Sequence, residues 1–332
     1  MKRCKHLSVL ILGFLLLALI IPTGNAVSAE AATESMGECV VELSSRRFLS
    51  ERGADKKLPM ASTTKIMTAL VILDEDNLDE IVTVPKEAEG TEGSSVYLKA
   101  GEVISVRELL YGLMLRSGND CAVTLALHHS GSIRNFARAM NEKAILLGAE
   151  DSNFTNPHGL PDDNHYTTAR DLALITAAAM ENETFREIVS TKFYEPRSWK
   201  NKNKMLWEFD GAIGVKTGFT VRAGRCLVSA AERDNMTLIC VVLNSPQMFE
   251  RSEELFENAF GEYQMTKLCS ASELYDGCRI NYDFSYPLCR GEEEKIVIQT
   301  ERGDGSDEIA GTMKIYLENR LLFSQNLFMI KE

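Results

Sequence analysis

The chain has 332 residues, of which 45% are hydrophobic and 25% are charged. This composition is typical of a globular protein, and the length allows a full catalytic core with a smaller unit beside it. The formal net charge is -12, and a surface of that sign does not hold nucleic acid or other acidic polymers by general attraction. The composition therefore argues against a nucleic-acid partner, and any anionic substrate must be held by local groups.

The first 29 residues have the pattern of an export signal. A basic head is followed by the almost wholly apolar run Leu7–Ile21, and Val27–Ala29 offers small residues for cleavage. We predict cleavage after Ala29, which removes three positive charges and takes the net charge from -12 to -15. The mature chain is then expected to be soluble outside the cytoplasmic membrane. An uncleaved anchor is the alternative, because the apolar run with its flanks approaches the ~20 residues that span a bilayer.

The first predicted elements are two strands and a helix. Residues 38–43 and 48–51 are strand-like runs separated by a turn. From Ser62 to Leu73 the apolar residues recur at helical spacing, so Ser62 lies at or near a helix N-terminus. The middle of the chain is predicted to be helical, and its N-cap residues are Ser105, Ser132 and Thr168.

Strands return at 212–219, 225–231 and 236–243, and a helix at 248–260 follows them. Strands at both ends of this region with helices between them predict one sheet assembled from distant segments. The fold class is therefore α+β, with the sheet and helices packed as layers.

Near residue 263 the sequence changes to short strands separated by turns. These strands are predicted at 295–300, 311–317 and 321–328. We therefore predict three units, which are the signal 1–29, a catalytic domain 30–262 and a small all-β C-terminal domain 263–332.

Three short motifs occur in a set order along the chain. They are Ser62-Thr63-Thr64-Lys65, Ser117-Gly118-Asn119 and Lys216-Thr217-Gly218. Each motif alone is a weak signal, because such tripeptides and tetrapeptides arise by accident in a chain of this length. Together their order, spacing and predicted context match the Ser-x-x-Lys, Ser-x-Asn and Lys-Thr-Gly set of serine acyl-transfer enzymes.

The first motif supplies a nucleophile and its base. Residues i and i+3 share one helical face, so the amine of Lys65 can reach the hydroxyl of Ser62. A serine hydroxyl is a weak nucleophile until a neighbouring base takes its proton. A lysine that is desolvated beside a second cation such as Lys216 can serve as that base near neutral pH.

The other two motifs supply substrate contacts and a proton relay. Ser117 can pass a proton to the leaving amine, and Asn119 can hydrogen-bond a substrate carbonyl. Lys216 and Thr217 can hold a terminal carboxylate by charge and hydroxyl. At Gly218 the missing side chain lets a substrate backbone pair alongside, and the N–H of the next residue, Phe219, joins that of Ser62 as an oxyanion hole.

The sequence resembles the low-molecular-weight penicillin-binding proteins, the serine-type D-Ala-D-Ala carboxypeptidases, over essentially the whole mature length. Besides the three motifs, the segments that carry this resemblance are 59–68 (PMASTTKIMT), 93–98 (GSSVYL), 157–160 (PHGL), 168–172 (TARDL) and 211–218 (GAIGVKTG).

The resemblance implies a β-lactamase/transpeptidase-like catalytic domain with an antiparallel sheet and helices. It implies cleavage of the last D-alanine from peptidoglycan stem peptides that end in D-Ala-D-Ala, and lasting acylation by β-lactam antibiotics such as penicillins. Two departures stand out: no C-terminal amphipathic anchor is evident, and Phe219 stands where some members have histidine. No residue within 248–251 aligns convincingly with a basic carboxylate-binding position.

Two rival functions share the same motifs. A β-lactamase must hydrolyse its acyl-enzyme quickly with a carboxylate-held water, and the region between Asn119 and Lys216 has no clear glutamate motif for that purpose. A catalytically silent β-lactam sensor or wall-binding protein would be acylated or would merely dock. The intact motifs favour the carboxypeptidase.

The remaining candidate residues are assigned structural roles. His158 and His165 lie in a loop, and the nucleophile already has a base, so neither is expected to be catalytic. Cys269, Cys278 and Cys289 are near one another in sequence, so a disulfide between two of them is one alternative and free thiols are the other. They lack the short Cys-x-x-Cys pairs of a zinc site. No metal and no other cofactor is expected.

Overall fold

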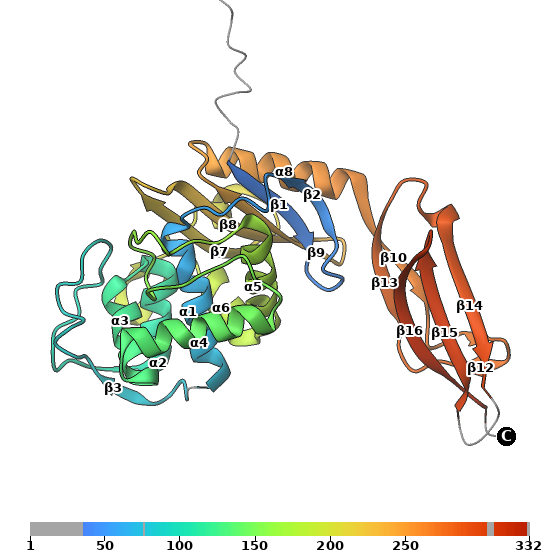
Figure 1. Ribbon diagram of the computed structural model, residues 1–332, viewed down its shortest axis with the longest axis horizontal. Coiled ribbons are helices and arrows are strands. Elements are labelled where there is room, and N and C mark those ends of the chain that lie inside the picture. Colours follow the sequence, from blue (N-terminus) through green and yellow to red (C-terminus); the bar gives the residue numbers. More distant parts are fainter. Residues whose placement is uncertain (1–35, 76, 304–308, 331–332) are drawn as a thin grey trace, which may run out of the picture.

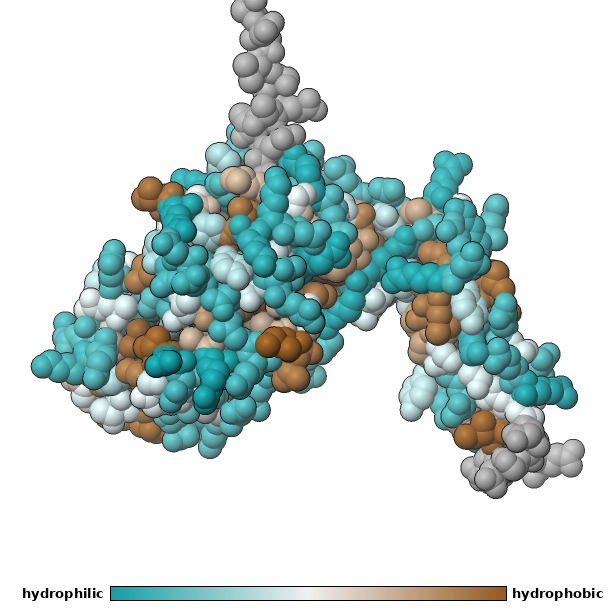
Figure 2. All heavy atoms as spheres, in the orientation of Figure 1, coloured by the Kyte–Doolittle hydropathy of each residue, from teal (hydrophilic) through white to brown (hydrophobic). Residues whose placement is uncertain are grey.

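The computed structural model describes residues 36–75, 77–303 and 309–330, so the predicted export signal at 1–29 lies outside the described residues. A body of helices around one sheet is followed by a narrower body of strands at the end of the last helix (Figure 1). The face drawn in Figure 2 is mainly hydrophilic, and its apolar side chains form separate small patches. None of the described helices is long and apolar enough to cross a membrane.

One five-stranded sheet organises the larger body. Its strands are β1 (Gly37–Glu42), β2 (Phe48–Arg52), β7 (Ala212–Thr220), β8 (Gly224–Arg233) and β9 (Met236–Leu243). They lie in the order β2-β1-β9-β8-β7, and every neighbouring pair is antiparallel. The N-terminal hairpin therefore joins the late strands, as predicted, and β7 forms an edge of the sheet.

Helices cover both faces of this sheet (Figure 1). Helix α8 (Met248–Glu262) packs on β8 and β9 on one face, whereas α5 (Ala169–Glu181) and α6 (Glu183–Ser190) pack on the other. Helix α1 (Lys65–Glu75) packs in turn on α5. Successive residues of a strand point to opposite faces, so the continuous apolar run of β9 is buried on both sides.

The other helices and short strands lie beside these layers. They are β3 (Ile81–Thr83), β4 (Val103–Ser105), α2 (Val106–Tyr111) with a π-helical turn at Gly112–Arg116, α3 (Asn119–Ser130), α4 (Ile133–Leu146), β5 (Phe193–Tyr194), β6 (Trp199–Lys200) and α7 (Met205–Glu208). The predicted N-caps are confirmed, because each hydroxyl accepts the backbone N–H three residues further on. These caps are Ser105, Ser132 and Thr168.

Two separate sheets make up the C-terminal part. A two-stranded ribbon contains β10 (Tyr263–Cys269) and β13 (Phe284–Cys289). The five-stranded sheet runs in the order β11-β12-β16-β15-β14. Its members are β11 (Leu274–Tyr275), β12 (Cys278–Arg279), β14 (Ile296–Arg302), β15 (Ile309–Leu317) and β16 (Arg320–Phe328).

Strands β14, β15 and β16 match the three predicted strands, but the sequence analysis missed β10 and β13. Strand β10 starts directly after α8, so no turn residue marks its beginning. Strand β13 contains Pro287, which argues against a central strand and is tolerated here in a two-stranded ribbon.

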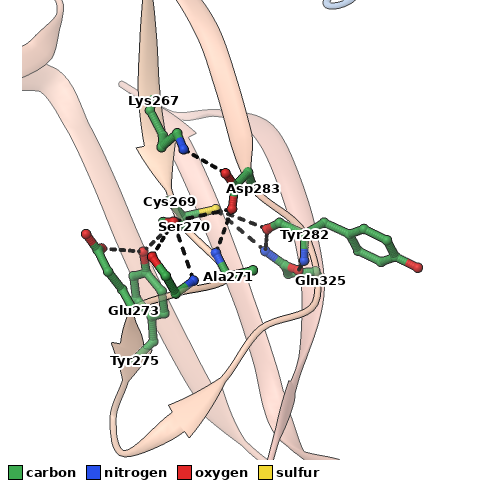
Figure 3. A network of polar contacts seen from close by, with 10 residues as sticks. Lys267, Cys269, Ser270, Ala271, Glu273, Tyr275, Tyr282, Asp283 and Gln325 are labelled. Carbon is green, nitrogen blue, oxygen red and sulfur yellow. Dashed lines mark hydrogen bonds and ion pairs between the residues drawn. The ribbon is translucent and has the colours of Figure 1, made fainter.

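A polar network joins the ribbon to the second sheet (Figure 3). Gln325 of β16 donates to the backbone oxygen of Tyr282 at 3.0 Å and accepts from its N–H at 3.3 Å. Asp283 accepts from Lys267 at 2.7 Å and from the N–H of Ala271 at 2.7 Å. Cys269, Cys278 and Cys289 are free thiols, so the structure has no disulfide among these three residues.

Candidate active site

Ser62 lies in a 3-10 turn, Ala61–Thr64, that leads directly into α1. The helix therefore begins three residues later than predicted, but the turn keeps Ser62 and Lys65 on one side. Two threonine hydroxyls tighten the turn: Thr63 donates to the carbonyl of Met60 at 2.7 Å, and Thr64 donates to the carbonyl of Ala61 at 2.8 Å. Ser62 stays partly exposed at its surface.

Lys65 is fully buried, and its amine contacts three oxygens. Nζ lies 2.6 Å from the backbone oxygen of His158, 2.7 Å from Oδ1 of Asn119 and 3.1 Å from Oγ of Ser62. Burial, followed by the positive charge of Lys216, lowers the pKa of Lys65 well below its ordinary value.

A neutral amine at this position has one direction left for its lone pair. Its two protons go to the carbonyl oxygens of His158 and Asn119, because these oxygens can only accept hydrogen bonds. The lone pair then faces the Ser62 hydroxyl, which can donate its proton to Nζ across 3.1 Å. In this arrangement a neutral Lys65 can accept a proton from the Ser62 hydroxyl.

Asn119 is the first residue of α3. Its Nδ2 donates to the carbonyl of Glu92 at 2.6 Å, which fixes the amide so that Oδ1 faces Lys65. Its backbone N–H donates to the carbonyl of Ser94 at 2.7 Å. Gly93 has a φ of +90°, and a Cβ there would lie 2.8 Å from Nδ2 of Asn119, so this close approach requires glycine.

Ser117 is buried beside this group, after the π-helical turn that ends α2. It adopts a left-handed φ of +65°, which is uncommon for a residue other than glycine. Its hydroxyl makes no hydrogen bond within the described parts of the chain. Among the described residues, no hydrogen bond joins Ser117 to Ser62 or Lys65.

Strand β7 brings the third motif to Ser62. A Cβ at Gly218 would lie 3.1 Å from the backbone nitrogen of Ser62, so the strand passes directly against the turn. Lys216 is buried, and its Nζ donates to the carbonyl of Thr217 at 2.9 Å. Burial, with a smaller effect of the Lys202 charge, lowers the pKa of Lys216 to about 7. Phe219 is 63% exposed.

Lys202 is the charged residue that the sequence analysis missed. It lies in the loop between β6 and α7, where its side chain is exposed between the buried Asn201 and Asn203, and its Nζ lies 3.3 Å from Oγ of Ser94. Its charge acts on both Lys65 and Lys216, lowering the pKa of each. A lone lysine in a polar loop gives no periodic or motif signal, so only the packing of that loop reveals it.

Arg251, in contrast, is occupied elsewhere. Its guanidinium lies on α8 and donates to Glu38 at 2.7 Å and 3.0 Å, and it also pairs with Glu254 at 2.6 Å. These contacts give no reason to propose that Arg251 binds a substrate carboxylate. The basic carboxylate-binding position that was sought within residues 248–251 therefore stays unassigned.

The two loop histidines both contact the nucleophile region. The backbone oxygen of His158 holds Lys65, whereas the imidazole Nδ1 of His158 accepts the N–H of Leu160 at 3.2 Å. His165 is buried, and its Nε2 lies 2.8 Å from the hydroxyl of Thr64. Neither imidazole has a hydrogen bond to Ser62.

Comparisons with known proteins agree on one family. The D-alanyl-D-alanine carboxypeptidase family, Peptidase_S11, matches residues 24–247. The chain is similar to the D-alanyl-D-alanine carboxypeptidase DacF of Bacillus subtilis, with 29% identity over 337 residues that cover 95% of this chain and 85% of that protein. A D-alanyl-D-alanine carboxypeptidase of Streptomyces sp. K15 is 39% identical over 230 residues, covering 62% of this chain and 79% of that protein.

Solved structures give the same result for the fold. The crystal structure of penicillin binding protein 5 from Haemophilus influenzae superposes with a TM-score of 0.75 at 28% identity, covering 90% of this chain and 97% of that chain. The predicted α+β fold of the low-molecular-weight penicillin-binding proteins is thereby confirmed. The chain belongs to the D-alanyl-D-alanine carboxypeptidase family of serine peptidases.

Proposed function

We propose that this chain removes the terminal D-alanine from peptidoglycan stem peptides through an acyl-enzyme on Ser62. The observation that carries the proposal is the buried amine of Lys65, which lies 3.1 Å from the Ser62 hydroxyl while two carbonyl oxygens take its own protons. A neutral amine in this position acts as the base for a weak nucleophile. The family and its relatives supply the substrate class.

The acylation step uses the turn and the edge strand together. Lys65 takes the proton of Ser62 while Oγ attacks the carbonyl carbon of the penultimate D-alanine. The backbone N–H groups of Ser62 and Phe219 receive the negative charge on the carbonyl oxygen. In support, the Ser62 N–H donates to no acceptor within the described residues, and Gly218 brings the Phe219 backbone close to it.

Proton delivery and hydrolysis complete the cycle. The peptide C–N bond breaks as the leaving D-alanine amine receives the proton, and Ser117 serves as the relay between Lys65 and that amine. Water then attacks the ester on Ser62, with Lys65 again taking a proton, and the shortened peptide leaves. The burial of Ser117 next to Asn119 supports this assignment.

The substrate is held on both sides of the scissile bond. Lys216 and Thr217 bind the terminal carboxylate by charge and hydroxyl. The second Nδ2 proton of Asn119, which the carbonyl of Glu92 leaves free, donates to a substrate carbonyl. The open edge of β7 pairs with the substrate backbone next to Gly218.

β-Lactam antibiotics are proposed to acylate the same serine. A β-lactam ring carries its amide nitrogen within the molecule, so the amine formed on ring opening stays attached and cannot diffuse away. The ester on Ser62 therefore persists, whereas D-alanine departs from the natural substrate.

The setting of this activity follows from the substrate. We propose that residues 1–29 export the chain, that 30–262 act on the peptidoglycan outside the cytoplasm as the catalytic domain, and that 263–332 form a separate C-terminal β domain. The C-terminal sheets have their own apolar cluster, around Met313 and Ile315, in support of that division.

The test combines product release with adduct mapping. The purified protein is expected to release D-alanine from a Lys-D-Ala-D-Ala peptide and to give, after penicillin treatment, a stable mass adduct on the Ser62 peptide. Both signals are expected to vanish in Ser62→Ala, and release is expected to vanish in Lys65→Ala. Rapid turnover of benzylpenicillin would identify a β-lactamase instead. An adduct without D-alanine release would identify a sensor, and an adduct on another peptide would exclude Ser62 as the nucleophile.

A further inference from the structure

We propose that His165 is a positioning residue for the acylation of Ser62: through the Thr64 hydroxyl it fixes the carbonyl of Ala61, and with it the strained turn that presents the nucleophile. The inference rests on the proposed role of Ser62. It assigns His165 a function in the reaction, where the sequence indicated only a loop residue.

The residue immediately before Ser62 has an unusual backbone conformation. Ala61 has a φ of +50°, in the left-handed region that residues with a Cβ rarely adopt, and it is 2% exposed. Such a conformation persists only when its surroundings hold it, and it is found preferentially at functional sites. The direction of the Ser62 N–H and side chain depends directly on this residue.

The Ala61 carbonyl is held from two sides. The Thr64 hydroxyl donates to it at 2.8 Å. On the other side, Gly159 lies so close that a Cβ built there would be 1.9 Å from the Ala61 oxygen, and the φ of Gly159 is +88°. The oxygen is therefore confined between a hydroxyl and a backbone that only glycine allows.

His165 gives the Thr64 hydroxyl its direction. The N–H of Thr155 donates to Nδ1 of His165 at 3.0 Å, so Nδ1 is the acceptor and the ring proton lies on Nε2. Nε2 then donates to the Thr64 oxygen across 2.8 Å, which leaves the Thr64 proton for the Ala61 carbonyl. Each donor in this series of three hydrogen bonds has one acceptor, so the bonds reinforce one another.

The imidazole is suited to a fixed, uncharged role. His165 is 3% exposed, and its ring meets Phe154 edge-on with centroids 5.9 Å apart. Burial is the main cause that lowers the pKa of His165 to about 4, with Asp162 opposing it and Lys65 adding to it. The ring is therefore neutral at neutral pH, as the donor on Nε2 and the acceptor on Nδ1 require.

This series of hydrogen bonds, from Thr155 through His165 and Thr64 to Ala61, positions Ser62. It does not hold the groups proposed to bind the substrate carboxylate, which lie on β7. Loss of the Nε2 donor is therefore expected to lower kcat and the rate of penicillin acylation by about 10- to 100-fold, because a small displacement of a reacting atom has that effect. KM for the peptide is expected to change by less than about threefold.

The experiment compares variants of the full chain. His165→Phe removes both nitrogens but fills the space, whereas His165→Gln keeps a donor near Nε2. Thr64→Val removes the hydroxyl, and Thr64→Ser keeps it. The matched control is His128→Phe. His128 lies on α3, where its Nε2 is 3.6 Å from Glu80, and it takes no part in the hydrogen bonds through His165 and Thr64. For each variant the rate of fluorescent-penicillin labelling, kcat, KM and the melting temperature are measured.

We expect slow acylation in His165→Phe and Thr64→Val, recovery to within about fivefold in His165→Gln and Thr64→Ser, and no change in the control. We also expect the double variant His165→Phe/Thr64→Val to be no slower than Thr64→Val alone, because both changes break the same series of hydrogen bonds.

Wild-type rates in folded His165→Phe with only a lowered melting temperature would reduce His165 to a structural residue and overturn the inference. If that variant does not fold, equal rates in Thr64→Val and Thr64→Ser overturn it in the same way. Failure of the unmodified protein to form an adduct on Ser62 would instead contradict the proposed function.

Discussion

The amine of Lys65 and the side-chain oxygen of Asn119 lie 2.7 Å apart, and both residues are buried. This contact takes one proton of the neutral amine and so directs the lone pair toward Ser62. Asn119→Ala is therefore expected to lower the acylation rate by about 100-fold, because Lys65, the proposed base, loses its orientation. The measurement is the second-order rate constant for penicillin labelling.

Asn119→Asp tests the electrostatic side of the same contact. A carboxylate beside Lys65 favours the charged amine and raises its pKa, so the base is protonated up to a higher pH. The acidic limb of the acylation rate is expected to move to higher pH, with activity partly regained in alkaline solution. Asn135→Asp adds the same charge at an exposed position of α4 and serves as the control. An unshifted limb in Asn119→Asp would show that Lys65 is not the titrating base.

The pKa of Lys216 predicts how kcat/KM falls at alkaline pH. Its pKa is lowered to about 7, chiefly by burial, so in the free enzyme it loses its positive charge as the pH rises through that value. We expect kcat/KM to fall above about pH 7 while kcat falls only at higher pH, because a bound carboxylate stabilises the charged lysine and raises its pKa. A kcat/KM that stays constant to pH 9 would contradict the assignment of Lys216 to the substrate carboxylate.

Removal of a neighbouring charge should move that limb. The positive charge of Lys202 lowers the pKa of Lys216, so Lys202→Gln is expected to shift the fall in kcat/KM to higher pH. Lys204→Gln is the matched control, since Lys204 lies two positions along the same loop and its Nζ stacks over Phe249 with 5.8 Å to the centroid. Equal limbs in the two variants would exclude Lys202 from the electrostatics of the site.

The sequence predicted the parts of the site that depend on local geometry. Ser62 and Lys65 are one turn apart, so their contact follows from spacing alone. The placement of Lys216 and Gly218 follows from the predicted strand 212–219, which contains both residues. The contact between Lys65 and the backbone oxygen of His158 was not predictable, because it depends on how a distant loop packs on the turn. The same holds for Lys202, whose loop has no periodic pattern.

The outer strands show the same division. β9 was predicted because its apolar run is buried on both faces, and its turn to β8 contains Asp234 and Asn235 with φ of +50° and +62°. β10 was missed because it follows α8 without a turn, and its side chains are mostly half-buried, which gives a weak pattern. Sequence periodicity therefore located the elements with a strongly buried face and failed where burial is partial.

Gly218 offers a test of the close approach between β7 and the nucleophile turn. A Cβ at this position would lie 3.0 Å from the oxygen of Met60 and 3.1 Å from the nitrogen of Ser62, and both are backbone atoms that cannot rotate away. Gly218→Ala is expected to lower acylation by about 10- to 100-fold, because β7 moves away from the turn.

Gly261→Ala is the control for Gly218→Ala. Nothing lies within 4 Å of a Cβ at Gly261, and this glycine lies in α8, where alanine is the better helix former by about 1 kcal/mol. It should leave acylation unchanged and raise stability slightly. If Gly218→Ala acylates as fast as Gly261→Ala, the spacing between strand and turn is not critical for the reaction.

The last prediction concerns the junction between the two bodies. Arg47, in the turn between β1 and β2, donates to both carboxylate oxygens of Glu292 at 2.8 Å and 2.6 Å and to the carbonyl of Pro287 at 2.6 Å. Its guanidinium also lies 5.1 Å and 5.3 Å from the ring centroids of Tyr263 and Tyr286. One side chain thus connects the first sheet with the β10–β13 ribbon.

Arg47→Met is expected to lower the free energy of unfolding of the junction by about 2 kcal/mol, because it leaves a mostly buried carboxylate without its partner. Hydrogen exchange of the ribbon amides should increase by roughly 30-fold, the factor that corresponds to this energy. Arg46→Met is the matched control. Its partner Glu181 is 68% exposed, so the loss there should stay below about 1 kcal/mol.

The pH dependence of this junction has a definite sign. The hydrogen bond from Arg47 is the main cause that lowers the pKa of Glu292 to about 2, below the ordinary carboxylate value. The pair therefore contributes its full stability above about pH 4.5 and loses it as the pH falls toward 2. Ribbon exchange in the unmodified protein should approach that of Arg47→Met over this window, once corrected for the intrinsic exchange rate. A difference between the two that is the same at pH 3 and at pH 7 would contradict an ionic Arg47–Glu292 contact as the cause.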